Sequence, residues 1–155
     1  MKVRPAENSD LGAVVALFDE VHQIHVAARP DQFRPAPEEA LAPRFREWLG
    51  AREAKVWVAE LDGQVVGYAV QLLKQREPHP LVRERRWWEI DAIGVTAAHR
   101  NKGIGTAIIE AILHDASLSE VKDVELASWA FNTGAHRAFA RAGFVPKYIR
   151  FELKR

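Results

Sequence analysis

The chain has 155 residues, of which 48% are hydrophobic and 28% charged, and its formal net charge is +1 at pH 7. This length and apolar fraction predict one domain, residues 1–155, that buries its own core. The near-neutral charge argues against nucleic acid as a partner, and the absence of cysteine excludes disulfides, thiolate metal sites and a cysteine nucleophile.

The N-terminal sequence MKVRPAENSD contains no apolar core of signal-peptide length. No apolar run approaches the roughly 18 residues that a membrane span requires. We therefore expect a cytoplasmic protein with no membrane partner.

The first third of the chain predicts a strand and two helices. Residues 1–4 are strand-like, and either Ser9 or Asp10 can cap a helix over residues 11–28, where apolar residues recur at helical spacing. After a proline-rich loop, residues 38–49 predict a second, shorter helix.

In the middle of the chain, apolar residues recur at every second position, which is typical of strands. Residues 55–61 and 64–74 flank the pair Asp62 and Gly63, which supplies the positive φ angles of a tight primed turn. A polar loop then leads to a further strand over residues 87–95. These segments predict antiparallel pairing.

The last third alternates helices and strands. A helix is predicted over 106–116, a strand over 123–129, a helix over 132–142, and one or two closing strands within 144–154. The predicted fold class is mixed α/β (α+β). Its central sheet is twisted and mostly antiparallel, with six to seven strands flanked by about four helices.

The stretch HRNKGIG, residues 99–105, joins the strand over 87–95 to the following helix. Amide groups at a helix start are unpaired and carry partial positive charge, so such a turn is suited to an anion. Gly103 and Gly105 permit close approach of a phosphate, and Arg100 and Lys102 add positive charge. A glycine-rich connection without a ligand is the alternative. Neither the dinucleotide-binding fingerprint nor a P-loop fits these letters.

Two motifs in this half of the chain resemble those of the GCN5-related N-acetyltransferases. VTAAHRNKGIG is similar to the family's acetyl-CoA signature, Arg/Gln-x-x-Gly-x-Gly/Ala. A second family signature, Asn-x-x-Ala followed by an aromatic residue and Gly-Phe, is matched by Asn132, Ala135, Phe139, Gly143 and Phe144. The two signatures stand in the family's order.

The resemblance implies acetyl-CoA as the acetyl donor, and we expect no metal. It implies that backbone N–H groups from Lys102 to Thr106 hold the pyrophosphate, while the pantetheine arm lies along the preceding strand. The positions that the family would use for the coenzyme are Ile93, Val95, Arg100, Lys102, Gly103, Ile104, Gly105, Thr106, Asn132 and Phe139.

Transfer to an amine requires a base for the ammonium proton, and a carboxylate in a partly desolvated cleft can serve. Glu89 and Asp91 are two residues apart on one predicted strand, so strict alternation places them on the same face. The resemblance implies that Glu89 is the base, with Asp91 second. The alternative is that one or both are solvated charges on the strand or ion-pair partners of Arg83, Arg85 or Arg86.

Position 139 departs from the family pattern. The family often has a tyrosine there that protonates the leaving thiolate, whereas this chain has Phe139. Either the thiolate leaves without an acid, or Tyr68 or Tyr148 serves from elsewhere. The resemblance also implies the backbone N–H of Ile93 as the oxyanion donor.

The resemblance places the acceptor pocket between the first helices and a later loop, which makes His25, Phe33 and His79 candidate substrate-binding residues. The alternative is a solvated helix face and a polar loop. His22 and His25 have a spacing compatible with a metal, but the sequence places no third ligand beside them.

We therefore expect direct transfer of an acetyl group from acetyl-CoA to a primary amine of a small molecule. Peptide or protein acetylation and a non-catalytic coenzyme A binding or sensing module are the alternatives. The last strands can also form a homodimer in either case.

Overall fold

Within residues 1–154, which the computed structural model describes apart from the side chain of Glu38, five strands form one sheet in the order β1-β2-β3-β4-β5. β1 to β4 pair antiparallel, and β5 runs parallel to β4. Along the chain the elements are β1 (Lys2–Pro5), η1 (Asn8–Asp10), α1 (Leu11–Ala28), α2 (Glu38–Gly50), β2 (Ala54–Leu61), β3 (Gln64–Arg76), β4 (Arg85–Val95), η2 (Ala97–His99), α3 (Ile104–Leu118), β5 (Val124–Leu126) and α4 (Thr133–Arg141).

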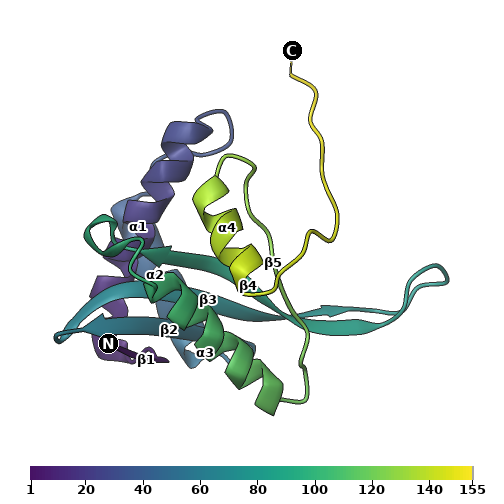
Figure 1. Cartoon of the computed structure of the whole chain (residues 1–155), viewed down its shortest axis with the longest axis horizontal. Helices are drawn as coiled ribbons and strands as arrows, with labels where there is room; N and C mark the ends of the chain where they lie inside the picture. The colour runs from purple at the N-terminus through teal and green to yellow at the C-terminus, as the bar shows by residue number, and fades with distance from the viewer. Residues whose placement is uncertain (155) are drawn as a thin grey trace.

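Helices cover both faces of this sheet (Figure 1). One face packs against α3, whose buried Ile104, Ile108 and Ile112 meet sheet residues such as Trp57. The other face packs against α1 and α2 through a separate cluster, listed as Val14, Leu17, Phe45, Val56, Val58, Tyr68 and Val70. Because most of the fully buried apolar residues are divided between these clusters, one on each face, the sheet is the middle layer of three.

The hairpin between β2 and β3 confirms the predicted primed turn. Asp62 and Gly63 have φ angles of 51° and 79°, and Leu61 pairs with Gln64. The next hairpin, between β3 and β4, continues beyond the core as a narrow ribbon that projects from the body (Figure 1).

The helix α1 departs from one sequence expectation. Together with η1, over residues 8–28, it is long and apolar enough by composition to cross a membrane. In the fold, α1 packs on the sheet: Val14 and Leu17 are buried, and a Cβ on Gly94 of β4 would lie 2.5 Å from a methyl carbon of Val21. The core of a globular domain therefore accounts for the apolar face of this helix.

The prediction of six to seven strands was wrong, since residues 1–154 form five. The difference lies after α4, where residues 144–154 are extended but form no backbone ladder with any of the five strands. A strand requires a partner for its backbone groups, and the described chain supplies none here. This C-terminal segment rises away from the sheet in Figure 1.

Candidate active site

The strands β4 and β5 are paired over only part of their length. Their parallel ladder joins Trp88, Glu89 and Ile90 to three residues of β5 and then ends. Beyond this point β4 continues to Val95, still paired with β3. Within residues 1–154, the β5-side edge of residues 91–95 has no strand partner. The sheet therefore opens along β4.

A β-bulge at Asp91 decides which backbone groups point into this opening. Val70 of β3 pairs with Ala92, and the next residue of β3 pairs with Ile90, so Asp91 is the extra residue. Before the bulge, the N–H of Trp88 bonds to the C=O of Asp123 on the β5 side. The extra residue shifts by one the positions whose backbone groups point to the β5 side.

Beyond the bulge, the N–H of Thr96 bonds to the C=O of Val66 on the β3 side. Because successive residues of a strand point their backbone groups to alternate sides, those of Ile93 and Val95 point to the open edge. These are the two positions that the sequence resemblance assigned to the pantetheine arm. The carbonyl of Val95 already accepts a hydrogen bond from Arg100 Nε at 2.9 Å.

The turn after β4 presents an open helix N-terminus. Gly103 is the N-cap of α3 with φ of 81°, and no side chain caps the helix. The first helical bond runs from the N–H of Ala107 to the C=O of Gly103 at 3.0 Å. The N–H groups of Ile104, Gly105 and Thr106 therefore have no partner within the helix, and an anion can accept from them.

The two basic residues of the turn are engaged with the protein itself. Arg100 donates to the C=O of Val95 and lies 3.3 Å from a carboxylate oxygen of Glu20. The ammonium of Lys102 donates to the C=O of Ala98 at 3.0 Å. Arg100 thus fixes the turn to β4, while Lys102 is exposed beside it.

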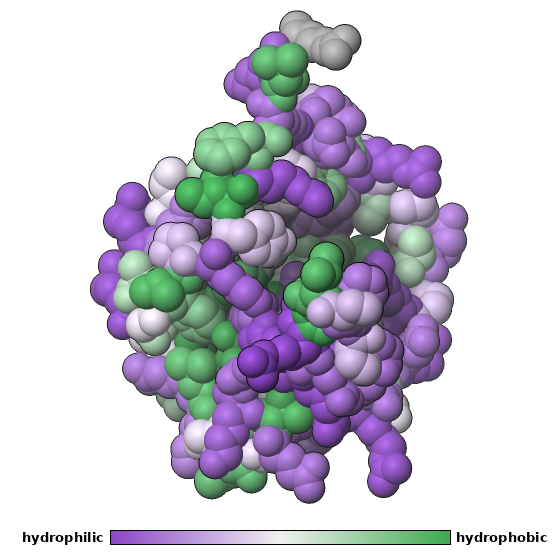
Figure 2. All heavy atoms as spheres, turned by 90° about the vertical axis from the view of Figure 1, so that its right-hand side faces the viewer, coloured by the Kyte–Doolittle hydropathy of each residue, from purple (hydrophilic) through white to green (hydrophobic). Residues whose placement is uncertain are grey.

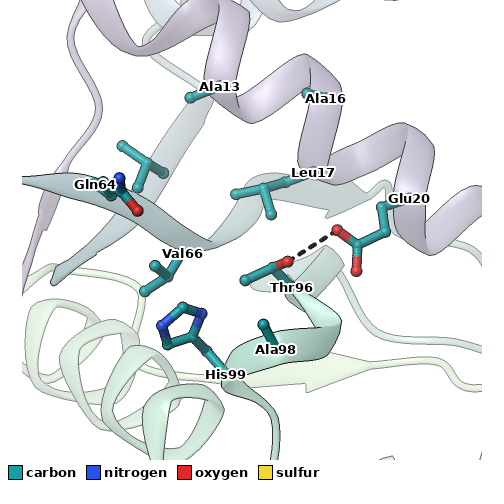
Figure 3. Close-up of a pocket in the computed structure, with 10 residues that line it drawn as sticks. Ala13, Ala16, Leu17, Glu20, Gln64, Val66, Thr96, Ala98 and His99 are labelled. Carbon is teal, nitrogen blue, oxygen red and sulfur yellow. Dashed lines mark hydrogen bonds between the residues drawn. The ribbon is translucent and has the colours of Figure 1, made fainter.

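Glu20 of α1 is a residue that sequence reasoning missed. Its carboxylate accepts hydrogen bonds from Thr96 Oγ1 at 3.0 Å and from the N–H of Ala97 at 2.7 Å. Figure 3 shows Glu20 directed at Thr96 across a pocket that His99 also lines. The only sign of this contact in the sequence was that a carboxylate stands one helical turn after the core residue Leu17. The contact joins α1 to the start of the turn.

Glu89 lies where β4 and β5 begin to separate. Its side chain is half-buried, and the indole N–H of Trp87 donates to one of its oxygens at 3.4 Å. Arg85, a suggested ion-pair partner, instead bonds to Glu125 and Asp123. Among residues 1–154, no ion pair with Glu89 is formed.

Asp91 is exposed, and its negative charge adds to burial in raising the pKa of the Tyr68 hydroxyl. The same-face prediction for Glu89 and Asp91 assumed strict alternation, which the bulge interrupts. This is visible in the packing, because Ile90 belongs to the α3 cluster while Ala92 packs with the α1 cluster.

The two tyrosines occupy different environments. Tyr68 is 1% exposed and packs among the rings of Phe18 and Phe45. Tyr148 is exposed on the C-terminal segment. Phe139 packs edge-on against Phe144, with ring centroids 6.3 Å apart.

An aromatic cluster joins the end of α1 to the loop before α4. The rings of His25 and Phe33 lie 5.4 Å apart, and they contact Phe131 at 5.6 Å and Trp129 at 5.3 Å, respectively. Trp129 and Phe131 were not among the predicted substrate residues, although both closely precede Asn132. His79 lies instead in the projecting hairpin loop, outside this cluster.

The histidines of α1 bond to backbone carbonyls. His25 Nδ1 lies 3.1 Å from the C=O of Val21, and His22 Nε2 lies 2.7 Å from that of Arg34. Because a carbonyl only accepts, these nitrogens carry the protons. Asn132 is the N-cap residue of α4, with its C=O accepting from His136 N–H.

Comparison with known proteins decides the family. The sequence profile of the acetyltransferase (GNAT) family matches residues 18–144. The chain belongs to the acetyltransferase (GNAT) family. The chain is 34% identical to mouse N-acetyltransferase 8F1 over 100 residues, which are 64% of this chain and 43% of that protein. The chain thus spans less than half the length of that relative.

Two solved structures share the fold of this GNAT protein. A mutant of the BH1408 protein from Bacillus halodurans is 29% identical, with a TM-score of 0.92 and 99% of each chain covered. The aminoglycoside N-acetyltransferase AAC(6')-Iy, solved in complex with CoA, is 18% identical, with a TM-score of 0.76. That match covers 99% of this chain and 94% of the other.

Proposed function

We propose that this protein transfers the acetyl group of acetyl-CoA directly to a primary amine of a small molecule. The observation that carries the proposal is the open edge of β4 ending at an uncapped helix N-terminus. Coenzyme A has the matching chemistry, because its pantetheine arm contains amides and its pyrophosphate is an anion.

In this proposal, backbone groups of Ile93 and Val95 pair with the amide-bearing arm as a neighbouring strand would. The N–H groups from Ile104 to Thr106 hold the pyrophosphate, and Lys102 adds positive charge beside them. Asn132, in the loop that begins α4, is suited to contact the arm from the β5 side.

Glu89 is the proposed base. It accepts the proton from the acceptor ammonium, directly or through water, so that the amine nitrogen can attack the thioester carbonyl. The N–H of Ile93 stabilises the carbonyl oxygen as its negative charge develops, and the C–S bond then breaks to release the thiolate. The extra proton left on the new amide nitrogen passes to the thiolate or to water, so that neutral amide and coenzyme A thiol are the products. With Tyr68 buried and Phe139 lacking a proton to give, the thiolate leaves without an acid from either residue. Asp91 is the second candidate for the base.

We assign the acceptor to the aromatic cluster of His25, Phe33, Trp129 and Phe131. Aromatic faces attract ammonium groups, so such a wall favours a cationic amine. The aminoglycoside acetyltransferase with the same fold supports a small-molecule acceptor. A peptide or protein amine is the alternative within the same chemistry.

The experiment is to measure thiol release from acetyl-CoA against amino acids, polyamines, aminoglycosides and short peptides with free or blocked N-termini. We expect turnover with a small-molecule amine, and Glu89→Gln lowers kcat by about 100-fold or more at unchanged acetyl-CoA affinity. Glu84→Gln, an exposed carboxylate on the hairpin loop, is the matched control and retains full activity.

Turnover with peptides alone would move the assignment to a protein acceptor. A non-catalytic coenzyme A module is the second candidate, and the absence of an acidic group at Phe139 is what favours it. If the protein is such a module, wild type and Glu89→Gln both bind the coenzyme, and neither releases thiol faster than the uncatalysed reaction.

A further inference from the structure

A serine in the loop between β5 and α4 is in contact with a histidine of α4. His136 Nε2 lies 3.1 Å from Ser128 Oγ and 3.0 Å from the carbonyl oxygen of Trp129. Because a carbonyl only accepts, Nε2 carries the proton and shares it with the serine oxygen. The hydrogen of the Ser128 hydroxyl is therefore directed away from the imidazole, and Ser128 donates to no group within residues 1–154.

Backbone hydrogen bonds fix the shape of this loop. The carbonyl oxygen of Trp129 also accepts from the N–H of Asn132 at 3.0 Å, and the N–H of Thr133 donates to the C=O of Phe131 at 3.0 Å. The helix α4 then runs back beside the segment that leaves β5 (Figure 1). The Ser128 oxygen thus has a defined position, although the residue is exposed and faces the space-filling surface that Figure 2 shows only in part.

The serine stands on the β5 side of the open edge of β4. The β4–β5 ladder ends where Ile90 pairs with Leu126, so Ser128 comes two residues beyond it. At that level β4 has passed its bulge and reaches Ala92 and Ile93. By this register, the N–H of Ile93 and the hydroxyl of Ser128 lie on opposite sides of the opening between the strands.

We propose that Ser128 is a catalytic residue that passes a proton to the departing thiolate, and that His136 positions its hydroxyl. This role rests on the proposed acetyl transfer, in which neither Tyr68 nor Phe139 serves as an acid. When the C–S bond breaks, its electron pair goes to sulfur, and the new amide nitrogen still carries an extra proton. The serine oxygen takes that proton while its own hydroxyl proton passes to sulfur, so both side chains end unchanged.

The positioning role of His136 requires no change in its protonation. The Nε2–H group that holds Ser128 is present in this tautomer of the imidazole and in the imidazolium. His136 also precedes Phe139 by one turn of α4, so the two residues lie on the same side of that helix. A polar group is therefore available one turn before the position that lacks one.

The first test is steady-state kinetics of the full chain with acetyl-CoA and an accepted amine. We expect Ser128→Ala to lower kcat by about 10- to 100-fold, with the Kd of acetyl-CoA within about twofold of wild type. His136→Leu lowers kcat by about tenfold, and His136→Gln restores most of it, because its amide N–H donates again. Ser128→Ala/His136→Leu is no slower than Ser128→Ala, because His136 acts through the serine.

Ser117→Ala and His114→Leu, at exposed positions of α3, are the matched controls and retain full activity. An unchanged kcat in Ser128→Ala would overturn the proposal. A loss in His136→Leu that adds to the loss in Ser128→Ala would overturn the positioning role, and so would a His136→Gln variant as slow as His136→Leu.

The second test needs no turnover, so it separates the role of Ser128 from the proposed function. The thiol of bound CoA is titrated by the ultraviolet absorbance of its thiolate. A hydrogen bond from Ser128 favours the thiolate, so bound CoA should ionise at a pH lower by about 0.5–1 unit in wild type than in Ser128→Ala. The Kd of CoA, measured on both proteins, shows that each is occupied.

Equal midpoints with CoA bound to both proteins would overturn the assignment of Ser128 and leave the acetyl transfer standing. A lower midpoint in a wild type that releases no thiol with any amine would instead contradict the acetyl transfer and leave only the contact of Ser128 with sulfur. A chain that binds no CoA would overturn both.

Discussion

Gly103 and Gly105 are separated by one residue, but the fold requires a glycine only at position 103. Gly103 has φ of 81°, the left-handed region in which a side chain costs about 1–2 kcal/mol. Gly105 lies inside α3, where an added Cβ would meet only a methyl carbon of Val95 at an ordinary 3.9 Å. The packing of the chain therefore leaves Gly105 unexplained, whereas a phosphate approaching the helix backbone explains it.

This contrast gives a prediction for Gly105→Ala. Alanine is better than glycine in a helix by up to about 1 kcal/mol, which raises the melting temperature by about 2–4 °C. The same methyl group crowds the proposed pyrophosphate position, and we expect at least a tenfold loss of acetyl-CoA affinity. Thermal melts and calorimetric titration measure the two effects.

Gly12→Ala is the matched control for that variant. Gly12 lies in the first turn of α1, and an added Cβ would have no neighbour within 4 Å. We expect a similar gain in stability with no change in affinity. If Gly105→Ala bound acetyl-CoA as tightly as Gly12→Ala, the pyrophosphate would not lie at this helix start.

At the scale of elements, the turn between β4 and α3 depends on a contact from α1. Glu20 accepts hydrogen bonds from Thr96 and from the N–H of Ala97, and it faces Arg100. These bonds fix the start of the turn, although Glu20 itself is not proposed to touch the coenzyme. It is a positioning residue.

We therefore expect Glu20→Ala to weaken acetyl-CoA binding by about five- to tenfold while kcat at saturating coenzyme stays within about twofold of wild type. The loss of charged hydrogen bonds also lowers stability by about 1–2 kcal/mol, since the group is partly exposed. Glu110→Ala, on the exposed face of α3, is the control. A drop in kcat with unchanged coenzyme affinity would contradict a positioning role.

The junction of β1 and α1 carries a pH-dependent contribution to stability. Buried Asp10 accepts hydrogen bonds from Arg4 at 2.7 and 3.1 Å and from the N–H of Glu7 at 2.7 Å. The hydrogen bond from Arg4 is the main cause that lowers the pKa of Asp10 in the folded chain. A lowered folded pKa stabilises the fold above the unfolded value of about 4, and this is lost as the pH falls through the folded value.

Asp10→Asn should therefore lower the free energy of unfolding by about 2 kcal/mol at pH 7. The difference from wild type should shrink as the pH falls from about 4 through the lower folded pKa, because Asp10 is protonated first in the unfolded chain and then in the folded one. Denaturant unfolding of both proteins at a series of pH values measures it. A difference that stays constant into acid would show that the lost interaction is not ionic.

Most element positions could be predicted from the sequence, because each depends on a local signal. The helix over residues 11–28 is observed with these bounds, and the turn at Asp62 and Gly63 followed from its own φ requirements. The β-bulge at Asp91 has no such signal, because it arises from the pairing of β3 with β4. Strict alternation therefore misplaced the relation between Glu89 and Asp91.

The site was predictable in its motifs but not in its long-range contacts. The residues that start α3 are contiguous, so local order alone was enough to predict an anion site there. Trp129 and Phe131 lie about a hundred residues from Phe33, and only the fold brings these rings together. The closing strands were predicted from a local alternating pattern, but residues 144–154 join no strand within the part of the chain that the structure describes.

At the scale of the whole molecule, helices pack on both faces of the sheet, and the sheet is open between β4 and β5. One core cluster covers each face of β2 and β3, so the short β4–β5 ladder does not compromise the fold. The open edge and the half-buried Glu89 both lie on β4, and the uncapped N-terminus of α3 follows the end of that strand. In the proposed function, the coenzyme and the base therefore lie on β4, and segments outside the sheet contribute the aromatic acceptor wall.

The central claim is that this strand and helix start bind acetyl-CoA. Calorimetric titration of acetyl-CoA into the wild-type chain tests it most directly. We predict saturable binding of one molecule per chain with a micromolar Kd, which the parent thiol CoA shares and adenosine alone does not. No saturable binding at concentrations near 1 mM, corresponding to a free energy weaker than about −4 kcal/mol, would contradict the account.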